Sequence, residues 1–242
     1  MTEPTVNEDQ NPLTKPKFII SAVVVAIIVA LGIILALLPK GGGNPATEPS
    51  NSGSTSASTQ PSAAAAASVC GLPSGDQAKP ATTPTDTKWE LVGKIAAPTS
   101  PTQFGPGKTE ANGLRSCFAH SPTGALYAGA NIVILASSGH NDLVLRYLTV
   151  DSPERDKMLG SSSPSGSSGG PSFQLAGFKL TDYTGDRAVI EYGFKVSNGT
   201  FGSLPVVLQW SGGDWKAVPP ASGQPEGKQL ADLSGFIPWE GV

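Results

Sequence analysis

The chain has 242 residues, a formal net charge of -3, two cysteines and two histidines. Once its polar tails are set aside, this length leaves room for one folded domain of ordinary size. The acidic balance, without any cluster of lysine and arginine, argues against direct binding of nucleic acid.

A continuous apolar run without charged residues occupies residues 18–38, after a short polar tail at residues 1–17. The run is long enough to cross the roughly 30 Å core of a bilayer as one helix. Lys15 and Lys17 precede it and Lys40 follows, which favours a cytoplasmic N-terminus and an extracytoplasmic C-terminal part. A cleaved secretory signal is the alternative, but the run is long and no small-x-small cleavage site closes it. We therefore predict a single-pass protein of the cell membrane.

Residues 39–88 are rich in Pro, Ser, Thr, Gly and Ala, a composition typical of a flexible linker that holds a domain off the lipid surface. Cys70 and Cys117 both lie on the C-terminal side of the apolar run. Cysteines in an oxidising compartment usually pair, so we predict a disulfide between them, with two free thiols as the alternative.

Helices are predicted in the first half of the outer domain. The alternating residues 89–95 suit a short strand or a strap against the domain. Ser121 and Pro122 form a helix start, and residues 124–136 are apolar on nearly every face, which favours a helix buried under a sheet. A second capping signal precedes a short helix at residues 153–159.

From Phe173 onward the apolar residues alternate with polar ones, which indicates strands. Glycine-containing turn signals separate the strands, and a slip in the apolar phase predicts a bulge at Ala176 and Gly177. The sequence therefore predicts an α+β domain at residues 89–218, with helices followed by a curved four-stranded antiparallel sheet. The strands are expected at residues 173–181, 187–196, 204–211 and 214–218.

The order of tail, apolar run, Pro/Ser/Thr linker, helices and bent sheet resembles the bitopic scaffold proteins of type IV secretion and conjugation machines. Their outer domain is an NTF2-like (cystatin-like) roll, and the resemblance implies the same fold here. Residues 89–239 are also similar to an uncharacterised actinobacterial family of membrane-anchored proteins of mobile elements. The matching phrases are Trp89-Glu-Leu-Val, Gly105-Pro106, Cys117-Phe-Ala-His-Ser-Pro-Thr-Gly-Ala-Leu126 and Leu233-Ser-Gly-Phe-Ile-Pro-Trp239.

Catalytic motifs and metal-ligand spacings are absent from the sequence, so we predict no enzyme activity, no metal and no cofactor. His120 precedes a helix start and His140 follows a Ser-Ser-Gly turn, so both are expected to be surface or capping residues. Some NTF2-like proteins use an Asp and a Tyr for proton transfer. Asp182 and Tyr183 have that chemistry, but their place beside a turn predicts a water-exposed strand end.

Two sets of apolar residues are candidates for binding. One would line a pocket inside the roll: Leu126, Tyr192, Phe194 and Trp210. The other lies in the C-terminal extension at residues 219–242, which carries too much apolar surface for a free tail. We expect this extension to pack on its own domain, with docking to a partner as the alternative. Its candidate docking residues are Leu230, Leu233, Phe236 and Trp239.

Three functions fit these features. The first is a non-enzymatic envelope scaffold of a conjugative or type IV secretion-like channel, which would contact other envelope proteins or form homo-oligomers. The second is a tethered extracytoplasmic module that binds a ligand or the cell wall, and it would require a well-formed apolar pocket. The third, a hydrolase or isomerase, would require convergent carboxylates or histidines inside such a pocket.

Overall fold

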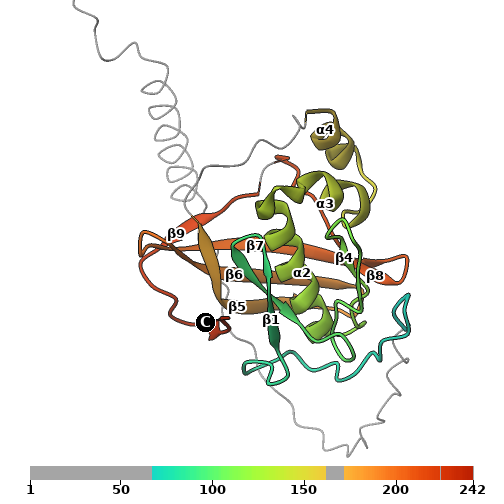
Figure 1. The fold of residues 1–242 in the computed structure, drawn as a ribbon, viewed down its shortest axis with the longest axis horizontal. Coiled ribbons are helices and arrows are strands. Elements are labelled where there is room, and N and C mark those ends of the chain that lie inside the picture. The colour runs from blue at the N-terminus through green and yellow to red at the C-terminus, as the bar shows by residue number, and fades with distance from the viewer. Residues whose placement is uncertain (1–66, 162–171, 224, 242) are drawn as a thin grey trace, which may run out of the picture. The chain divides into compact units, whose positions relative to one another are not determined.

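The computed structural model describes residues 67–161, 172–223 and 225–241 (Figure 1). The predicted membrane helix at residues 18–38 and the first part of the linker lie outside these residues. Across the ranges that are described, no helix has the length and apolar character needed to cross a membrane.

A six-stranded antiparallel sheet forms the centre of the domain, with the strand order β10-β5-β6-β7-β8 and with β9 also paired to β7. The predicted fold class, an α+β NTF2-like (cystatin-like) roll with a four-stranded sheet, is therefore wrong, because the described domain is mostly β and has six strands in this sheet. Two of these strands come from the C-terminal extension and are too short to show an alternating pattern. The strands are β5 (Phe173–Tyr183), β6 (Arg187–Val196), β7 (Phe201–Ser211), β8 (Asp214–Ala217), β9 (Lys228–Leu230) and β10 (Ile237–Pro238).

The four central strands follow the predicted meander, and the bulge prediction is confirmed by a register shift between Leu175 and Gly177. A second register shift lies between Leu180 and Asp182, where the apolar pattern of the sequence did not predict a bulge. The β7–β8 turn places Gly212 and Gly213 at φ values of 65° and 82°. Positive φ at both central residues is the requirement of a type I′ hairpin turn, which explains the glycine pair.

Helix α2 (Pro122–Leu135) packs against one face of the sheet, as Figure 1 shows. Its predicted start is confirmed: the hydroxyl of Ser121 accepts a hydrogen bond from the Gly124 N–H at 3.0 Å, and Pro122 occupies the first turn. Nearly all of its residues are buried, because the sheet covers one side and the β1–β2 hairpin covers another. This double cover explains why the helix is apolar all round.

A kinked segment, η2 (Ala136–His140), joins α2 to α3 (Asn141–Tyr147). Gly139 has a φ of 89° there, the left-handed conformation that commonly ends a helix. The hydroxyl of Ser138 donates to the Val92 carbonyl at 3.0 Å and ties the kink to strand β1. The chain therefore turns sharply after α2, and α3 continues in a new direction beside the sheet.

The chain before α2 is more ordered than its composition suggests. The predicted strand at residues 89–95 is a hairpin of β1 (Lys88–Val92) and β2 (Ile95–Thr99), followed by the short pair β3 (Lys108–Thr109) and β4 (Arg115–Ser116). Ser68 and Leu72 are buried, so part of the segment predicted as linker packs on the domain.

The C-terminal extension crosses the outer face of the sheet, the face opposite α2. Strand β9 pairs with β7, and β10 pairs with β5. Between them, the side chains of Leu233 and Phe236 pack against Gly193, and Phe236 also packs against Gly177. Gly177 and Gly193 face each other in the β5–β6 register, so together they leave a hollow for these two side chains. We call residues 228–241 the strap.

Gly129 provides the first test of this packing. A Cβ on Gly129 would lie 2.3 Å from the hydroxyl oxygen of Tyr192, which donates to the Leu126 carbonyl at 2.8 Å. We expect Gly129→Ala to destabilise the protein by about 2–3 kcal/mol, because overpacking exceeds the roughly 1 kcal/mol gain in helix propensity. Denaturant unfolding of the purified protein measures the change.

The matched control is Gly160→Ala, in helix α4 (Pro153–Ser161), where a Cβ meets nothing within 4 Å. It should be neutral or stabilising by up to about 1 kcal/mol. Combining Gly129→Ala with Tyr192→Phe should recover part of the loss, since the clashing oxygen is removed. A Gly129→Ala protein as stable as wild type would contradict the described contact between helix and sheet.

Candidate functional site

An apolar cavity of about 930 Å³ follows the outer edge of strand β7. Strand β9 covers this edge at Phe201–Ser203 and β8 covers it from Leu208 onward, so residues 204–207 have no strand partner there in the described sheet. The carbonyl of Val207 accepts a hydrogen bond from the Val218 N–H, at 2.8 Å. Pro205 has no N–H and prevents a further strand from pairing at this gap. We call this cavity the β7 groove.

The walls of the β7 groove lie on both faces of the sheet. Residues of β7 alternate between the faces, so Leu204 and Val206 reach it on the side of α2, and Val207 and Gln209 reach it on the outer side. The helix-side walls are aliphatic and come from α2 and α3. They include Ile132, Val133, Val144 and Leu145. The groove therefore joins an aliphatic inner part to a more polar outer part.

The kink after α2 shapes the inner part. Because η2 turns the chain, Ala136, Ser137 and Asn141 line the groove together instead of continuing the buried helix. Residues 219–222 and Pro225 close the other side after β8 ends. Pro219, Pro220 and Pro225 each have a fixed φ, so this wall of the groove has little backbone freedom. Kinks and π-turns in helices are common at functional sites, which agrees with a binding role for the groove.

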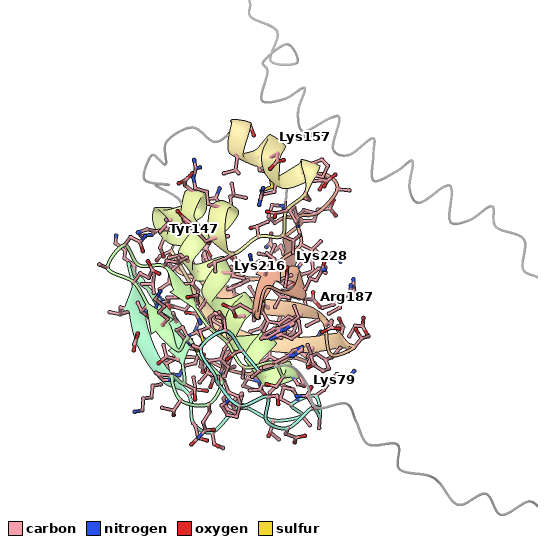
Figure 2. The ribbon with its side chains drawn as sticks, turned by 90° about the vertical axis from the view of Figure 1, so that its right-hand side faces the viewer. Lys79, Tyr147, Lys157, Arg187, Lys216 and Lys228 are labelled. Carbon is pink, nitrogen blue, oxygen red and sulfur yellow. A yellow bond between two sulfur atoms is a disulfide. The ribbon has the colours of Figure 1, made fainter. Side chains whose placement is uncertain are left out.

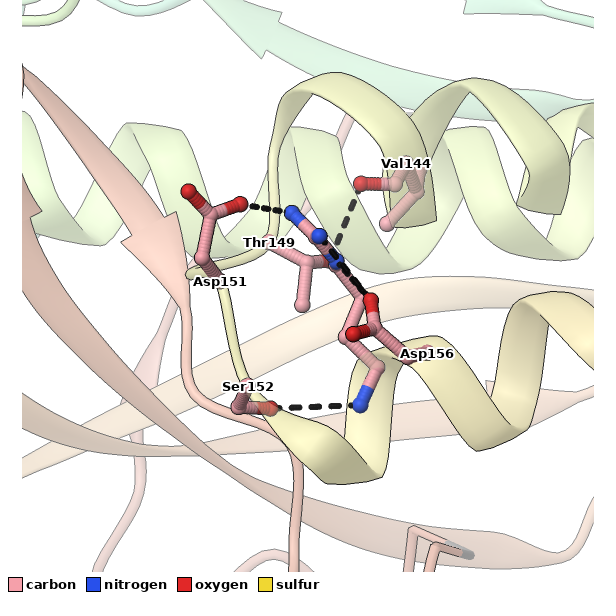
Figure 3. A network of polar contacts seen from close by, with 6 residues as sticks. Val144, Thr149, Asp151, Ser152 and Asp156 are labelled. Carbon is pink, nitrogen blue, oxygen red and sulfur yellow. Dashed lines mark hydrogen bonds and ion pairs between the residues drawn. The ribbon is translucent and has the colours of Figure 1, made fainter.

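A polar network positions α4, whose Met158 lines the groove (Figure 3). The hydroxyl of Thr149 donates to the Val144 carbonyl at 2.9 Å, and the Arg155 N–H donates to the Ser152 hydroxyl at 3.2 Å. The guanidinium of Arg155 bridges Asp151 and Asp156. The helix start predicted at Ser152 is confirmed by this cap, and the network fixes the first turn of α4 and the segment that precedes it.

Cationic side chains border the outer part. Arg187, Gln209 and Lys216 stand in one cross-strand row on β6, β7 and β8, so their side chains leave the sheet on the same face. Arg187 also pairs with Asp182 at 2.9 Å, and both side chains are half-exposed. Figure 2 labels Arg187 and Lys216 of this row, together with Lys228 of β9 and Lys157 of α4. Arg187 and Gln209 line the groove itself.

The predicted pocket residues lie elsewhere. Leu126, Tyr192 and Phe194 belong to the hydrophobic core between α2 and the sheet, and Trp210 packs against that core. None of these four lines the β7 groove. These residues pack against α2 in the core of the domain, so the structure gives them a packing role.

The predicted docking residues belong to the strap. Trp239 is 1% exposed, and its ring contacts those of Trp89, Tyr127 and Phe178 at centroid distances of 5.1–5.6 Å. It is therefore not available to a partner. The others, Leu230, Leu233 and Phe236, are half-buried on the domain, and Lys179 Nζ lies 3.9 Å from the centroid of the Phe236 ring. This arrangement agrees with the expectation that the extension packs on its own domain.

His120 is buried, which contradicts the expectation of a surface or capping residue. Its ring stacks on Trp210 with centroids 3.9 Å apart, and its Nε2 lies 3.1 Å from the Gly185 carbonyl and 3.3 Å from Asp186. Its backbone carbonyl accepts a hydrogen bond from Gln77 at 2.9 Å. His120 thus links the N-terminal segment to the β5–β6 turn and does not line the groove.

The other candidate catalytic residues do not line the groove, although Asp182 forms an ion pair with the lining residue Arg187. Asp182 lies at an exposed strand end, as predicted, whereas the half-buried Tyr183 hydroxyl donates to Gln77 Oε1 at 2.8 Å. Burial, with a smaller contribution from Asp186, raises the pKa of Tyr183 to about 12, so it remains protonated near neutral pH. His140 ends the kinked segment, and its buried Nδ1 has no hydrogen-bond partner among the described residues.

Asp214 is a buried carboxylate that the sequence did not single out. It accepts hydrogen bonds from the N–H groups of Cys117, Phe118 and Trp215 at 2.6–2.9 Å. Burial raises its pKa, while these N–H groups oppose the rise. It holds Cys117 at a φ of 68°, beside the confirmed disulfide to Cys70. Within the described ranges, no group of three or more His, Cys, Asp or Glu side chains could hold a metal ion.

One sequence signal coincides with the groove. Residues 204–208, Leu-Pro-Val-Val-Leu, are apolar at every position, whereas a strand with one wet face alternates. An uninterrupted run indicates apolar neighbours on both faces. In the structure Pro205 and Val207 both line the β7 groove, where Pro205 is exposed and Val207 is half-buried.

Comparison with known proteins gives a family for the chain. A family model described as a domain of unknown function (DUF8175) matches residues 50–238. No curated protein and no solved structure matches the chain significantly. The match covers the described domain from its N-terminal segment to β10, together with residues that precede it. The chain therefore belongs to the DUF8175 family.

Proposed function

We propose that the protein is a non-enzymatic, membrane-anchored module of the cell envelope that acts by binding an apolar ligand in the β7 groove. One observation carries the proposal: an aliphatic cavity of about 930 Å³ at the edge of an otherwise packed sheet. Small-molecule sites in proteins usually have volumes of about 300–1,000 Å³ and mostly apolar walls. The groove has the same character.

Two features of the sequence support the envelope location. The apolar run at residues 18–38 provides an anchor, and lysines on its N-terminal side favour an extracytoplasmic domain. The disulfide between Cys70 and Cys117 suits an oxidising compartment.

Binding without chemistry is supported by the position of the reactive groups. The imidazole of His120 is stacked on Trp210 outside the groove, and the Tyr183 hydroxyl is bonded to Gln77. A general acid or base must reach the ligand within hydrogen-bonding distance, directly or through one water. Asp186 and Glu226 line the groove, and the Asp186 carboxylate lies 3.3 Å from His120 Nε2, but neither His120 nor His140 is itself a lining residue.

The resemblance to conjugation scaffolds supplies a setting, a channel in the envelope of an actinobacterium. The resemblance now rests on the tail, the apolar run and the linker, since the roll is not the observed fold. In that setting the groove would hold a component that the channel needs, and homo-oligomers or contacts with other channel proteins would be built on the remaining surface.

A matched pair of variants tests the function. Val207 lines the groove and Val189 does not, yet they are cross-strand neighbours on the same face and both are half-buried. We expect Val207→Asp to lower conjugative transfer from a complemented deletion strain by about tenfold or more, because a buried charge weakens binding by at least 1.4 kcal/mol. Val189→Asp should transfer like wild type, with both proteins present at equal levels.

Equal transfer by Val207→Asp and Val189→Asp would contradict the role of the groove. A deletion strain that transfers normally would contradict the conjugative setting, because the protein would then be dispensable there. These two results are separable, since the first compares variants and the second compares strains with and without the protein.

A further inference from the structure

We propose that the ligand of the β7 groove is a single aliphatic chain with an anionic head group, of the fatty-acid or lysophospholipid type. This inference rests on the proposed binding function and names the chemical class of the ligand. The chain would lie along the aliphatic inner part, and the head would reach the cross-strand row of Arg187, Gln209 and Lys216.

The walls favour an aliphatic chain over other apolar ligands. Ile132, Val133, Val144 and Leu204 supply branched side chains, and the groove has no aromatic lining residue in the described part of the chain. Sugars and proline-rich peptides are usually bound on aromatic side chains, so both are disfavoured. A peptide strand is disfavoured too, because Pro205 interrupts the backbone donors of the β7 edge.

The dimensions also suit a long chain. The groove follows β7 from Leu204 to Gln209, five residue steps of about 3.4 Å, or roughly 17 Å. This is close to the length of an extended long-chain fatty acid.

The end of the groove at Gln209 offers hydrogen-bond donors for an anion. Arg187 is half-exposed, and its ion pair with Asp182 is a surface pair, which costs little to rearrange. Gln209 contributes an amide, and Lys216 lies opposite Gln209 in the register. The lining carboxylate nearest this end, Asp186, faces His120 at 3.3 Å. The other lining carboxylate is Glu226. Its neighbour Gly227 lies beside Ser203 and Leu204, so Glu226 belongs to the other end of the groove.

Photolabelling with matched probes tests this assignment on the full chain in lipid nanodiscs. Three diazirine probes would share one sixteen-carbon chain and differ in the head group: carboxylate, alcohol and trimethylammonium. A lysophosphatidate probe with the same chain distinguishes a phosphate head from a carboxylate. We expect peptides containing residues 132–145 and 204–218 to be labelled, with about tenfold more labelling by the anionic probes than by the cationic one.

Two variants complete the experiment. Arg187→Gln combined with Lys216→Gln should reduce the preference for anionic probes severalfold and leave labelling by the alcohol unchanged. Lys195→Gln, on the same face at the far end of β6, is the matched control and should change neither. Equal labelling by anionic and cationic probes in the wild-type protein would overturn the head-group assignment.

Labelling of the groove peptides no stronger in wild type than in Val207→Asp would overturn the aliphatic ligand altogether. If Val207→Asp nevertheless reduced transfer while Val189→Asp did not, the proposed function would stand and the groove would bind a different occupant, such as an apolar helix of another protein. Failure of the ligand class and failure of the function therefore give different results.

Discussion

Replacing Trp239 with alanine should lower the free energy of unfolding by about 3–5 kcal/mol, the usual cost of removing a fully buried large aromatic side chain. Trp239 is the point where the strap enters the core. Its indole N–H donates to the Thr87 hydroxyl at 3.1 Å, and that hydroxyl lies 2.6 Å from the Tyr127 hydroxyl. The change therefore leaves a cavity, and the Thr87 hydroxyl loses one hydrogen-bond partner. Equilibrium unfolding of the purified protein measures it.

Two variants control this result. Trp239→Phe keeps most of the ring packing and loses the N–H donor, so it should cost less than the alanine variant. Glu240→Ala changes the exposed neighbouring residue and should stay within about 0.5 kcal/mol of wild type. An alanine variant within about 1 kcal/mol of wild type would show that the strap is dispensable, and a docking role for the C-terminal extension would return.

Removing the disulfide by the double change Cys70→Ser and Cys117→Ser should cost about 4 kcal/mol, from the chain-entropy model for a loop of this length. The two cysteines are 47 residues apart, and the loop between them contains both N-terminal hairpins. The bridge ties the segment at Ser68 and Leu72 to Cys117, which Asp214 holds to strand β8. Without the bridge, the unfolded chain regains the freedom of that loop.

Reduction of the wild-type protein should reproduce this loss, and mass mapping without reductant should find the Cys70–Cys117 peptide pair. Val69→Ser is the matched control, because Val69 lies beside Cys70 and is 69% exposed. It should change stability by less than about 0.5 kcal/mol. If the double variant unfolded at the same denaturant concentration as wild type, the loop would already be constrained by its contacts with the domain.

Local signals determined the central part of the fold. The cap at Ser121 and Pro122, the glycine pair at Gly212 and Gly213 and the phase slip before Gly177 each act through neighbouring residues. Such features are therefore legible in the sequence, and the structure contains them where they were predicted. The pairing of Cys70 with Cys117 also followed from the sequence, because the chain has no other cysteine.

The tertiary structure alone decided what the strap and the N-terminal segment do. Strands β9 and β10 have three and two residues, which is too short for any period, and they form because β7 and β5 offer open edges. Likewise, His120 is buried because Trp210 arrives beside it from a strand 90 residues later in the chain. Contacts of this kind depend on the meeting of distant segments, which no local pattern records.

The candidate site divides in the same way. The apolar run at residues 204–208 departs from the alternation of a strand with one wet face, and it marks the part of β7 that lines the groove. The groove itself exists because β8 and β9 cover different parts of one edge of β7 and because the chain turns at Gly139 after α2. Where a sheet edge is left uncovered is a property of strand pairing, and pairing is decided by the packing of the whole domain.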